Sequence, residues 1–216
     1  MSTIPGLITC NLMKKDLQEG LRPYLPDRSL EIVMDWIYGR RILMRIARGR
    51  RTKLGDYRPP VKDDIHRISV NGDLNPFEFL LTLTHEIAHL LTWEKYGRRY
   101  KPHGIAWKKQ FAFMLGMLIN ENIFPLEIRS EIRKQVDNPR SNSKCNTELA
   151  RALHSHNPVQ HGIFLEDLPP GALFSLPNGR KFQKQEKLRK WYRCKSQDNH
   201  KSYRISPVAK VIPAEI

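Results

Sequence analysis

The stretch NPFEFLLTLTHEIAHLLTWEKYG at residues 75–97 predicts a long helix that decides the fold. Asn75 suits the N-cap, Pro76 suits the first helical position, and Glu78 can complete a capping box. Gly97 suits the C-terminal end of the helix. Because this helix is apolar nearly all round, we expect it to lie in the protein core.

Two histidines stand four residues apart in this helix, within HEIAH at 85–89. Side chains at positions i and i+4 project from one face about 5–6 Å apart, so both imidazoles can reach one ion. Zinc at a catalytic site needs neutral imidazole ligands, an open position and a nearby carboxylate, which Glu86 supplies. His103, in the loop before the next helix, is the expected third ligand. The alternative is a chance match without metal, which would leave costly polar groups in an apolar helix. The sequence therefore predicts one Zn²⁺ ion on His85, His89 and His103, with Glu86 as the catalytic residue.

The periodicity of the remaining chain predicts an α+β fold. Apolar residues recur at helical spacing in several segments, and two further segments alternate as strands around a basic loop that passes through Gly55. We expect helices packed with a small antiparallel sheet, in a core followed by a small β-rich basic C-terminal region. The predicted helices cover 13–24, 30–37, 107–118, 125–136 and 147–153, and the predicted strands cover 42–46 and 66–70. The predicted domains are residues 1–160 and 161–216.

HEIAH at 85–89 followed by HGIAW at 103–107 resembles the SprT-like family, the zincin metalloproteases that include Spartan-type enzymes acting on DNA–protein crosslinks. The resemblance covers about residues 1–160 and is extended by HRISVN at 66–71, RGRRTKLGDYR at 48–58 and NPRSNSKCNTELARAL at 138–153. It implies a SprT metalloprotease core and peptide hydrolysis in which zinc acidifies a water molecule and Glu86 takes its proton. Four residues beside the site are candidates to stabilise an oxyanion, and the sequence does not choose among them: Tyr96, Arg98, Arg99 and Tyr100.

The C-terminal region departs from the family pattern. Many bacterial relatives end in a four-cysteine zinc ribbon, whereas this region offers only Cys194. One interpretation is a degenerate ribbon that has kept its strands and basic surface and lost its metal. A different second metal site would use Cys145, His154, His156 and His161, but their spacing matches no standard zinc finger. We favour surface histidines and a buried thiol.

The charge is strongly positive, with 37 Lys and Arg against 22 Asp and Glu and a net charge of +15. It is also uneven, because residues 68–93 contain no Lys or Arg while the segments on either side are basic. A polyanion, here single- or double-stranded DNA, is the expected partner, together with DNA-bound protein substrates. The alternative is that the cations solvate the surface and the aromatic residues pack the C-terminal region. The candidate DNA contacts are Arg48, Arg50, Arg51, Lys53 and Arg58, joined by Arg40, Arg41 and Arg45, and in the C-terminal region Lys187, Arg189, Lys190, Trp191 and Arg193, with Tyr192 and Tyr203 beside them.

Composition excludes several other classes of protein. The longest nearly uncharged stretch, residues 79–92, is too short to cross a bilayer, and the N-terminus lacks the charge order of a secretory signal. Three scattered cysteines fit a reducing interior, so we expect a cytoplasmic monomer that associates with the nucleoid when bound to DNA. Two alternative functions remain beside the DNA-associated protease. One is a nucleic-acid-binding adaptor with a structural zinc core, and the other is a general or regulator-cleaving zinc peptidase.

Overall fold

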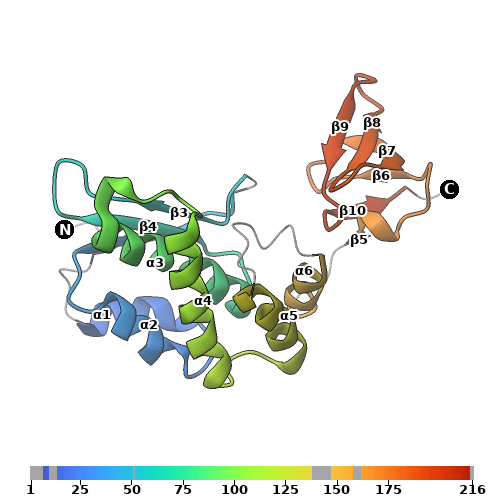
Figure 1. The fold of residues 1–216 in the computed structure, drawn as a ribbon. Helices are drawn as coiled ribbons and strands as arrows, with labels where there is room; N and C mark the ends of the chain where they lie inside the picture. Colours follow the sequence, from blue (N-terminus) through green and yellow to red (C-terminus); the bar gives the residue numbers. More distant parts are fainter. Residues whose placement is uncertain (1–6, 10–13, 51, 138–146, 158–161, 215–216) are drawn as a thin grey trace. The chain divides into compact units, whose positions relative to one another are not determined.

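The computed structural model describes residues 7–9, 14–50, 52–137, 147–157 and 162–214. The chain divides into two compact units, Met1–Ser141 and Asn142–Ile216 (Figure 1). The boundary predicted after residue 160 therefore falls inside the second unit. The physical reason is helix α6 (Thr147–His154), whose Arg151 guanidinium forms ion pairs with Glu166 and Asp167 of the same unit.

The described strands of the first unit form a four-stranded sheet in the order β1-β2-β4-β3. The expectation of an antiparallel sheet was wrong in one respect, because β2 and β4 run parallel. Strand β3 lies between them in sequence but pairs with the outer edge of β4, so the chain enters β4 in the same direction as β2. Strand β1 was not predicted, and β3 falls in the segment predicted as a basic loop. The strands are β1 (Leu7–Thr9), β2 (Ile42–Ala47), β3 (Gly55–Arg58) and β4 (His66–Asn71).

The predicted helices are present in the first unit, with bounds close to those expected. On α3 the Asn75 side chain accepts a hydrogen bond from the Glu78 N–H at 3.0 Å, and the helix ends at Gly97, where φ is +58°. Most residues of α3 between Phe79 and Thr92 are buried, and α4 buries the predicted apolar face that begins with Trp107. The helices are α1 (Lys14–Leu21), α2 (Ser29–Ile37), α3 (Pro76–Tyr96), α4 (Ile105–Asn120) and α5 (Leu126–Asp137).

Alternate residues of the sheet serve opposite faces. Met44 and Ile68 are buried on the face that packs against the helices, whereas Arg45 and Arg67 lie on the other face. Strand β3 follows the same rule, with Gly55 and Tyr57 paired opposite residues of the helix-facing side of β4. This arrangement brings the edge strand β3 directly beside the long helix α3.

The second unit is β-rich, as predicted. Its described strands form a six-stranded antiparallel arrangement in the order β5-β10-β6-β7-β8-β9 around a core that includes Phe174, Phe182 and Cys194. Burial raises the pKa of the Cys194 thiol to about 11, so this cysteine packs as an apolar side chain. The strands are β5 (Ile163–Phe164), β6 (Leu173–Ser175), β7 (Lys181–Lys187), β8 (Tyr192–Ser196), β9 (Ser202–Ile205) and β10 (Lys210–Pro213).

The α+β fold class is thus confirmed, with a small sheet in one unit and a larger one in the other. Among the described residues, no helix combines the length and the hydropathy that crossing a bilayer would need.

Candidate metal centre and catalytic pocket

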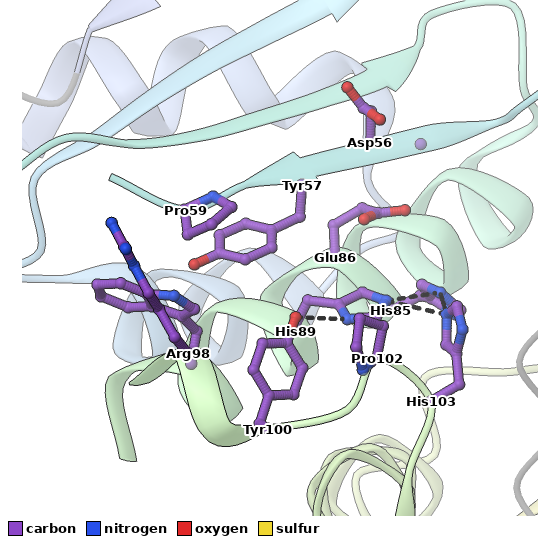
Figure 2. A pocket seen from close by; sticks show the side chains of 12 residues that line it. Asp56, Tyr57, Pro59, His85, Glu86, His89, Arg98, Tyr100, Pro102 and His103 are labelled. Carbon is purple, nitrogen blue, oxygen red and sulfur yellow. Dashed lines mark hydrogen bonds between the residues drawn. The ribbon is translucent and has the colours of Figure 1, made fainter. Parts of the chain in front are cut away.

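Three histidines converge at one point in the first unit (Figure 2). The Nε2 atoms of His85 and His89 lie 3.2 Å apart, and His103 Nε2 lies 3.2 Å from the first and 3.0 Å from the second. Nitrogen ligands of one tetrahedral zinc ion, with Zn–N bonds of about 2.0–2.1 Å, lie about 3.3 Å from one another. The triad predicted from the sequence therefore has the spacing of a metal-binding set.

The protonation of the triad also suits a cation. Burial, together with the neighbouring imidazoles, lowers the pKa of His85 and of His89 to about 3. Burial also lowers the pKa of His103. Neutral imidazoles facing one another through Nε2 present converging lone pairs, an arrangement that a divalent ion satisfies and that hydrogen bonds among three neutral rings do not. The donor set therefore fits a divalent metal ion.

Helix α3 supplies two of these ligands, and a turn before α4 supplies the third. Pro102 and His103 occupy the centre of a β-turn closed by the Gly104 N–H on the Lys101 carbonyl at 2.8 Å. His103 adopts a left-handed conformation with φ of +60°, which is costly for a residue with a side chain. Such strain is typical of residues whose placement serves a site. The sequence motif found His103 but gave no sign of this conformation.

Trp107 on α4 packs against all three imidazoles. Its ring centroid lies 4.7 Å from that of His85, 5.1 Å from that of His89 and 4.8 Å from that of His103. The indole is fully buried, and its Nε1 has no hydrogen-bond partner among the described residues. The tryptophan of the HGIAW motif thus fixes the orientation of the ligand rings through packing.

Glu86 is buried beside the triad, on the side of the pocket next to β3 (Figure 2). Its carboxylate accepts a hydrogen bond from the backbone N–H of Tyr57. Burial, helped by the charge of Asp56 and opposed by the charges of Arg50 and Lys53 and by the Tyr57 N–H, raises the pKa of Glu86 to about 8. The carboxyl group is thus held in the wall of the pocket that the three histidines also line.

The close approach of β3 to Glu86 depends on a glycine. A Cβ atom on Gly55 would lie 2.8 Å from Glu86 Cγ and 2.8 Å from Thr82 Cγ2, closer than real Cβ atoms come to such neighbours. Only a residue without a side chain allows β3 and α3 to pack this closely. Sequence reasoning missed Gly55, because a single glycine in a basic segment carries no signal of what it faces.

A buried amide fixes the segment that leads into β3. The Asn71 side chain accepts a hydrogen bond from Arg50 Nε at 2.8 Å and donates to the carbonyls of Arg50 and Lys53 at 3.1 and 3.2 Å. The Arg50 guanidinium also donates to Ser69 Oγ at 3.0 Å. Arg50, predicted as a DNA contact, is therefore half-buried and bound within the protein.

Two tyrosines flank the His89 ring. The Tyr100 hydroxyl lies 3.3 Å from His89 Nδ1, so it can hold this ring with Nε2 directed at the metal position. Tyr57 stacks parallel to His89 with ring centroids 6.2 Å apart, and its hydroxyl lies 3.0 Å from His66 Nδ1. Burial raises the pKa of both tyrosines, which keeps both hydroxyls protonated.

These residues line an open pocket of about 550 Å³. Two of the four candidates for oxyanion stabilisation, Arg98 and Tyr100, are among the lining residues. Figure 2 shows Arg98 at the opposite end of the pocket from His103, and Tyr100 next to His89. A pocket of this volume is within the range of ligand sites in proteins.

The candidate DNA contacts of the first unit have different environments. Arg48 is exposed, Lys53 and Arg58 form ion pairs with Asp56 at 2.8 and 3.0 Å, and Arg51 lies outside the described residues. Arg40 and Arg41 form ion pairs with Glu94 and Asp64. The structure therefore separates residues that are free to bind a ligand from those engaged within the fold.

The candidate contacts of the second unit gather at the β7–β8 hairpin. Hydrogen bonds between Leu188 and Trp191 close a turn with two residues at its tip, and the Trp191 side chain is 42% exposed. Tyr192 and Tyr203 instead pack against the core of the unit. The alternative that the aromatic residues pack the C-terminal region is thus confirmed for these two tyrosines. It does not describe Trp191, whose side chain is exposed. The candidate contacts in this hairpin are all exposed, and Arg193 among them pairs with Glu186: Lys187, Arg189, Lys190, Trp191 and Arg193.

A second metal site from cysteine and histidine is absent from the described residues, where the triad is the one cluster of the required geometry. Cys145 and His161, two of its proposed ligands, lie outside the described residues.

The chain matches no protein-family model, and it has no significant match among curated proteins or solved structures. The assignment of function therefore rests on the residues of the site.

Proposed function

We propose that the chain is a zinc-dependent endopeptidase of the SprT-like type that acts on proteins bound or crosslinked to DNA. The observation that carries this proposal is the meeting of three neutral imidazoles and one buried carboxylate, Glu86, in a single open pocket. The motifs at 85–89 and 103–107 support the same assignment through their resemblance to that family.

The number of ligands favours catalysis over a structural role. Structural zinc sites take four protein ligands, whereas catalytic sites keep a position open for water or substrate. Within the part of the chain that the structure describes, no fourth histidine, cysteine or carboxylate joins His85, His89 and His103. A non-catalytic adaptor would have no use for the open position.

The chain's own residues supply the acid–base chemistry. Zinc bound to the triad would polarise the scissile carbonyl and make an attacking water more acidic. Glu86 would accept a proton from that water as its oxygen bonds to the carbonyl carbon, then donate the proton to the leaving nitrogen as the C–N bond breaks. The Tyr57 N–H holds the Glu86 carboxylate in place, and Tyr100 holds the His89 ring.

The edge of the sheet suits an extended substrate. Strand β3 lies at the end of the described sheet, and its residues Gly55 and Tyr57 line the pocket. An extended peptide can pair with such an edge, which would place a backbone carbonyl near the triad. Arg98, at the far end of the pocket, would then meet a substrate residue some distance from the cleaved bond.

The exposed hairpin of the second unit supports association with DNA. Its cations can contact phosphates, and Trp191 can stack on an unpaired base. Such contacts carry little sequence information, which suits an enzyme that acts wherever a protein is attached. A location with the nucleoid in the cytoplasm follows from this proposal.

A cleavage assay with a DNA-binding protein as substrate tests the proposal. The purified chain is incubated with the substrate, with and without DNA, and is compared with the Glu86→Gln variant. We expect DNA-dependent cleavage that falls by about 10²–10⁴-fold in Glu86→Gln, because the general base is lost. Metal analysis should show zinc retained. The matched control is Glu121→Gln, which changes an exposed glutamate outside the pocket.

The alternative functions give different results in this assay. Equal cleavage by the Glu86→Gln variant would remove Glu86 from the mechanism. Cleavage that is indifferent to DNA would favour a general zinc peptidase. Zinc and DNA binding without cleavage of any substrate would favour the adaptor.

A further inference from the structure

The face of the first unit's sheet opposite the metal pocket carries a second hollow, a groove of about 500 Å³. Alternation along the strands places most of its strand residues, among them Arg45, Arg58 and Arg67, on the face away from the buried side of the sheet. Five arginines line it, and we call it the arginine groove: Arg45, Arg48, Arg50, Arg58 and Arg67.

The groove has an excess of positive charge. Asp56 is the one acidic residue among the lining residues, and it pairs with Arg58 and with Lys53 outside the lining. Arg67 pairs with Asp63. The side chains of Arg45 and Arg48 are exposed and have no hydrogen bond or ion pair among the described residues. Two guanidinium groups are therefore free to bind an anion.

Arg58 and Arg67 occupy directly opposed positions on β3 and β4. Like charges opposite each other on one face of a sheet destabilise the pair of strands. The nearby aspartates offset this cost without removing it, because both ion pairs are partly exposed. An arrangement that costs stability in the free protein is understandable where an anionic ligand compensates for it.

The spread of the arginines distinguishes a polyanion from a single small anion. Arg45, Arg67 and Arg58 lie on the successive strands β2, β4 and β3. Neighbouring strands are about 4.8 Å apart, so these three positions extend over roughly 10 Å. Positions spread over this distance suit contacts with successive phosphates of a chain.

The lining chemistry distinguishes backbone recognition from base recognition. Between the arginines the groove presents Leu43, Ala47 and Ser69, and none of the lining residues is aromatic. Binding of unpaired bases relies on aromatic stacking platforms, and this groove has none. Phosphate contacts by arginine remain as its means of recognition.

We infer that the arginine groove binds the phosphodiester backbone of DNA. This inference rests on the proposed association with DNA and adds a contact surface within the first unit. Strand β3 separates the two sites, with Gly55 and Tyr57 lining the pocket and Arg58 lining the groove. DNA in the groove would leave the metal pocket open, so a protein attached to that DNA would reach the pocket around the edge of β3.

Fluorescence anisotropy with labelled DNA tests the inference in the Glu86→Gln background, where cleavage does not interfere. The test variant is Arg45→Gln/Arg48→Gln, which removes the two free cations of the groove. The matched control is Lys109→Gln/Arg133→Gln, which removes two cations from α4 and α5. Both variants lower the net charge by the same amount, and circular dichroism checks that each one is folded.

We expect the groove variant to bind duplex DNA about tenfold more weakly, with the slope of log Kd against log salt reduced by about 1 to 2, because each lost phosphate contact contributes about 0.9. The control should bind within about twofold of the parent. Single-stranded DNA should show a similar loss in the groove variant, since no base is read.

Equal weakening in the test variant and the control would overturn the inference, because it would reflect net charge alone. Unchanged binding in the groove variant would also overturn it. Hydrolysis of a DNA-free protein substrate by the same variants with Glu86 intact reports separately on the peptidase. The failure of the groove and the failure of the proposed activity are thus distinguishable.

Discussion

Gly55 of β3 lies against the side chain of Glu86, so closely that a methyl group at position 55 would come within 2.8 Å of Glu86 Cγ. The position of the carboxylate is therefore set by a neighbouring strand as well as by its own helix. Tyr57, two residues along the same strand, donates its backbone N–H to this carboxylate. The catalytic proposal can thus be tested through β3 without changing a metal ligand or Glu86.

Gly55→Ala should displace Glu86 and reduce peptide cleavage by at least about tenfold, since misplacing a catalytic group by about 1 Å can cost 10²-fold. Zinc content should stay the same, because the triad is untouched. Cleavage kinetics and metal analysis check both results. Gly116→Ala is the control, because nothing lies within 4 Å of its Cβ position in α4. That change should leave activity unchanged and stabilise the helix by about 0.5–1 kcal/mol.

Tyr100→Phe should weaken zinc binding by about 10–100-fold, because it removes the hydroxyl that lies 3.3 Å from His89 Nδ1. Competition with a chromogenic chelator measures the affinity. The control is Tyr96→Phe, which removes an exposed hydroxyl from the same segment. Equal zinc affinity in both variants would show that Tyr100 does not orient His89.

Asn71→Ala should destabilise the first unit by about 1–3 kcal/mol, because it leaves Arg50 Nε and two carbonyl groups without their hydrogen bonds. Denaturant unfolding with tryptophan fluorescence measures the loss. Asn120→Ala, at an exposed position at the end of α4, should change stability by less than about 0.5 kcal/mol. A similar effect of the two changes would mean that Asn71 does not fix the segment before β3.

Stability should depend on the protonation of His66. Burial lowers its pKa, with the charge of Glu94 acting to raise it and that of Arg40 to lower it, and the Tyr57 hydroxyl contacts Nδ1. The unfolded chain therefore takes up a proton on His66 more readily than the folded chain, so this residue destabilises the fold as the pH falls below about 6.5. Unfolding free energies of the parent and of His66→Gln, measured from pH 8 to pH 5, should converge as the pH falls. A constant difference would contradict this expectation.

Trp191→Ala should weaken binding of single-stranded DNA by about 1–3 kcal/mol and leave duplex binding nearly unchanged, because stacking needs an unpaired base. Anisotropy with the two kinds of DNA measures both. Leu173→Ala is the control, since Leu173 is similarly exposed in the same unit. Equal losses in both variants, or a loss on duplex DNA as large as on single strands, would contradict stacking by Trp191.

The elements that periodicity and capping specify were predictable from the sequence. Asn75 and Gly97 bound α3 as expected, and the apolar series that begins with Trp107 marks the buried face of α4. The two histidines of HEIAH are neighbours on that helix by local geometry alone. That His103 joins them was predicted from the motif alone. The turn that places His103 depends on a left-handed backbone conformation of this residue, which the sequence does not indicate.

Other features depend on long-range contacts and could not be predicted. Strand β3 is only four residues long and strongly polar, so its alternation is hidden within a basic segment. The role of Gly55 depends on its contact with α3, and that of Arg50 depends on its hydrogen bond to Asn71. Neither contact is visible in the sequence. Charge counting found the basic segments, but it could not separate the free Arg48 from the internally bonded Arg50.

The alternation along β3 makes the length of the preceding segment a constraint on both surfaces. Where inserting or deleting one residue between Ala47 and Gly55 slips β3 by one position against β4, every side chain of β3 turns to the opposite face. Tyr57 would then point away from His89, and Arg58 would enter the metal pocket. A slip of two residues would restore the original faces. Variants with an odd change in the length of this segment should therefore lose both surfaces, and variants with an even change should keep them.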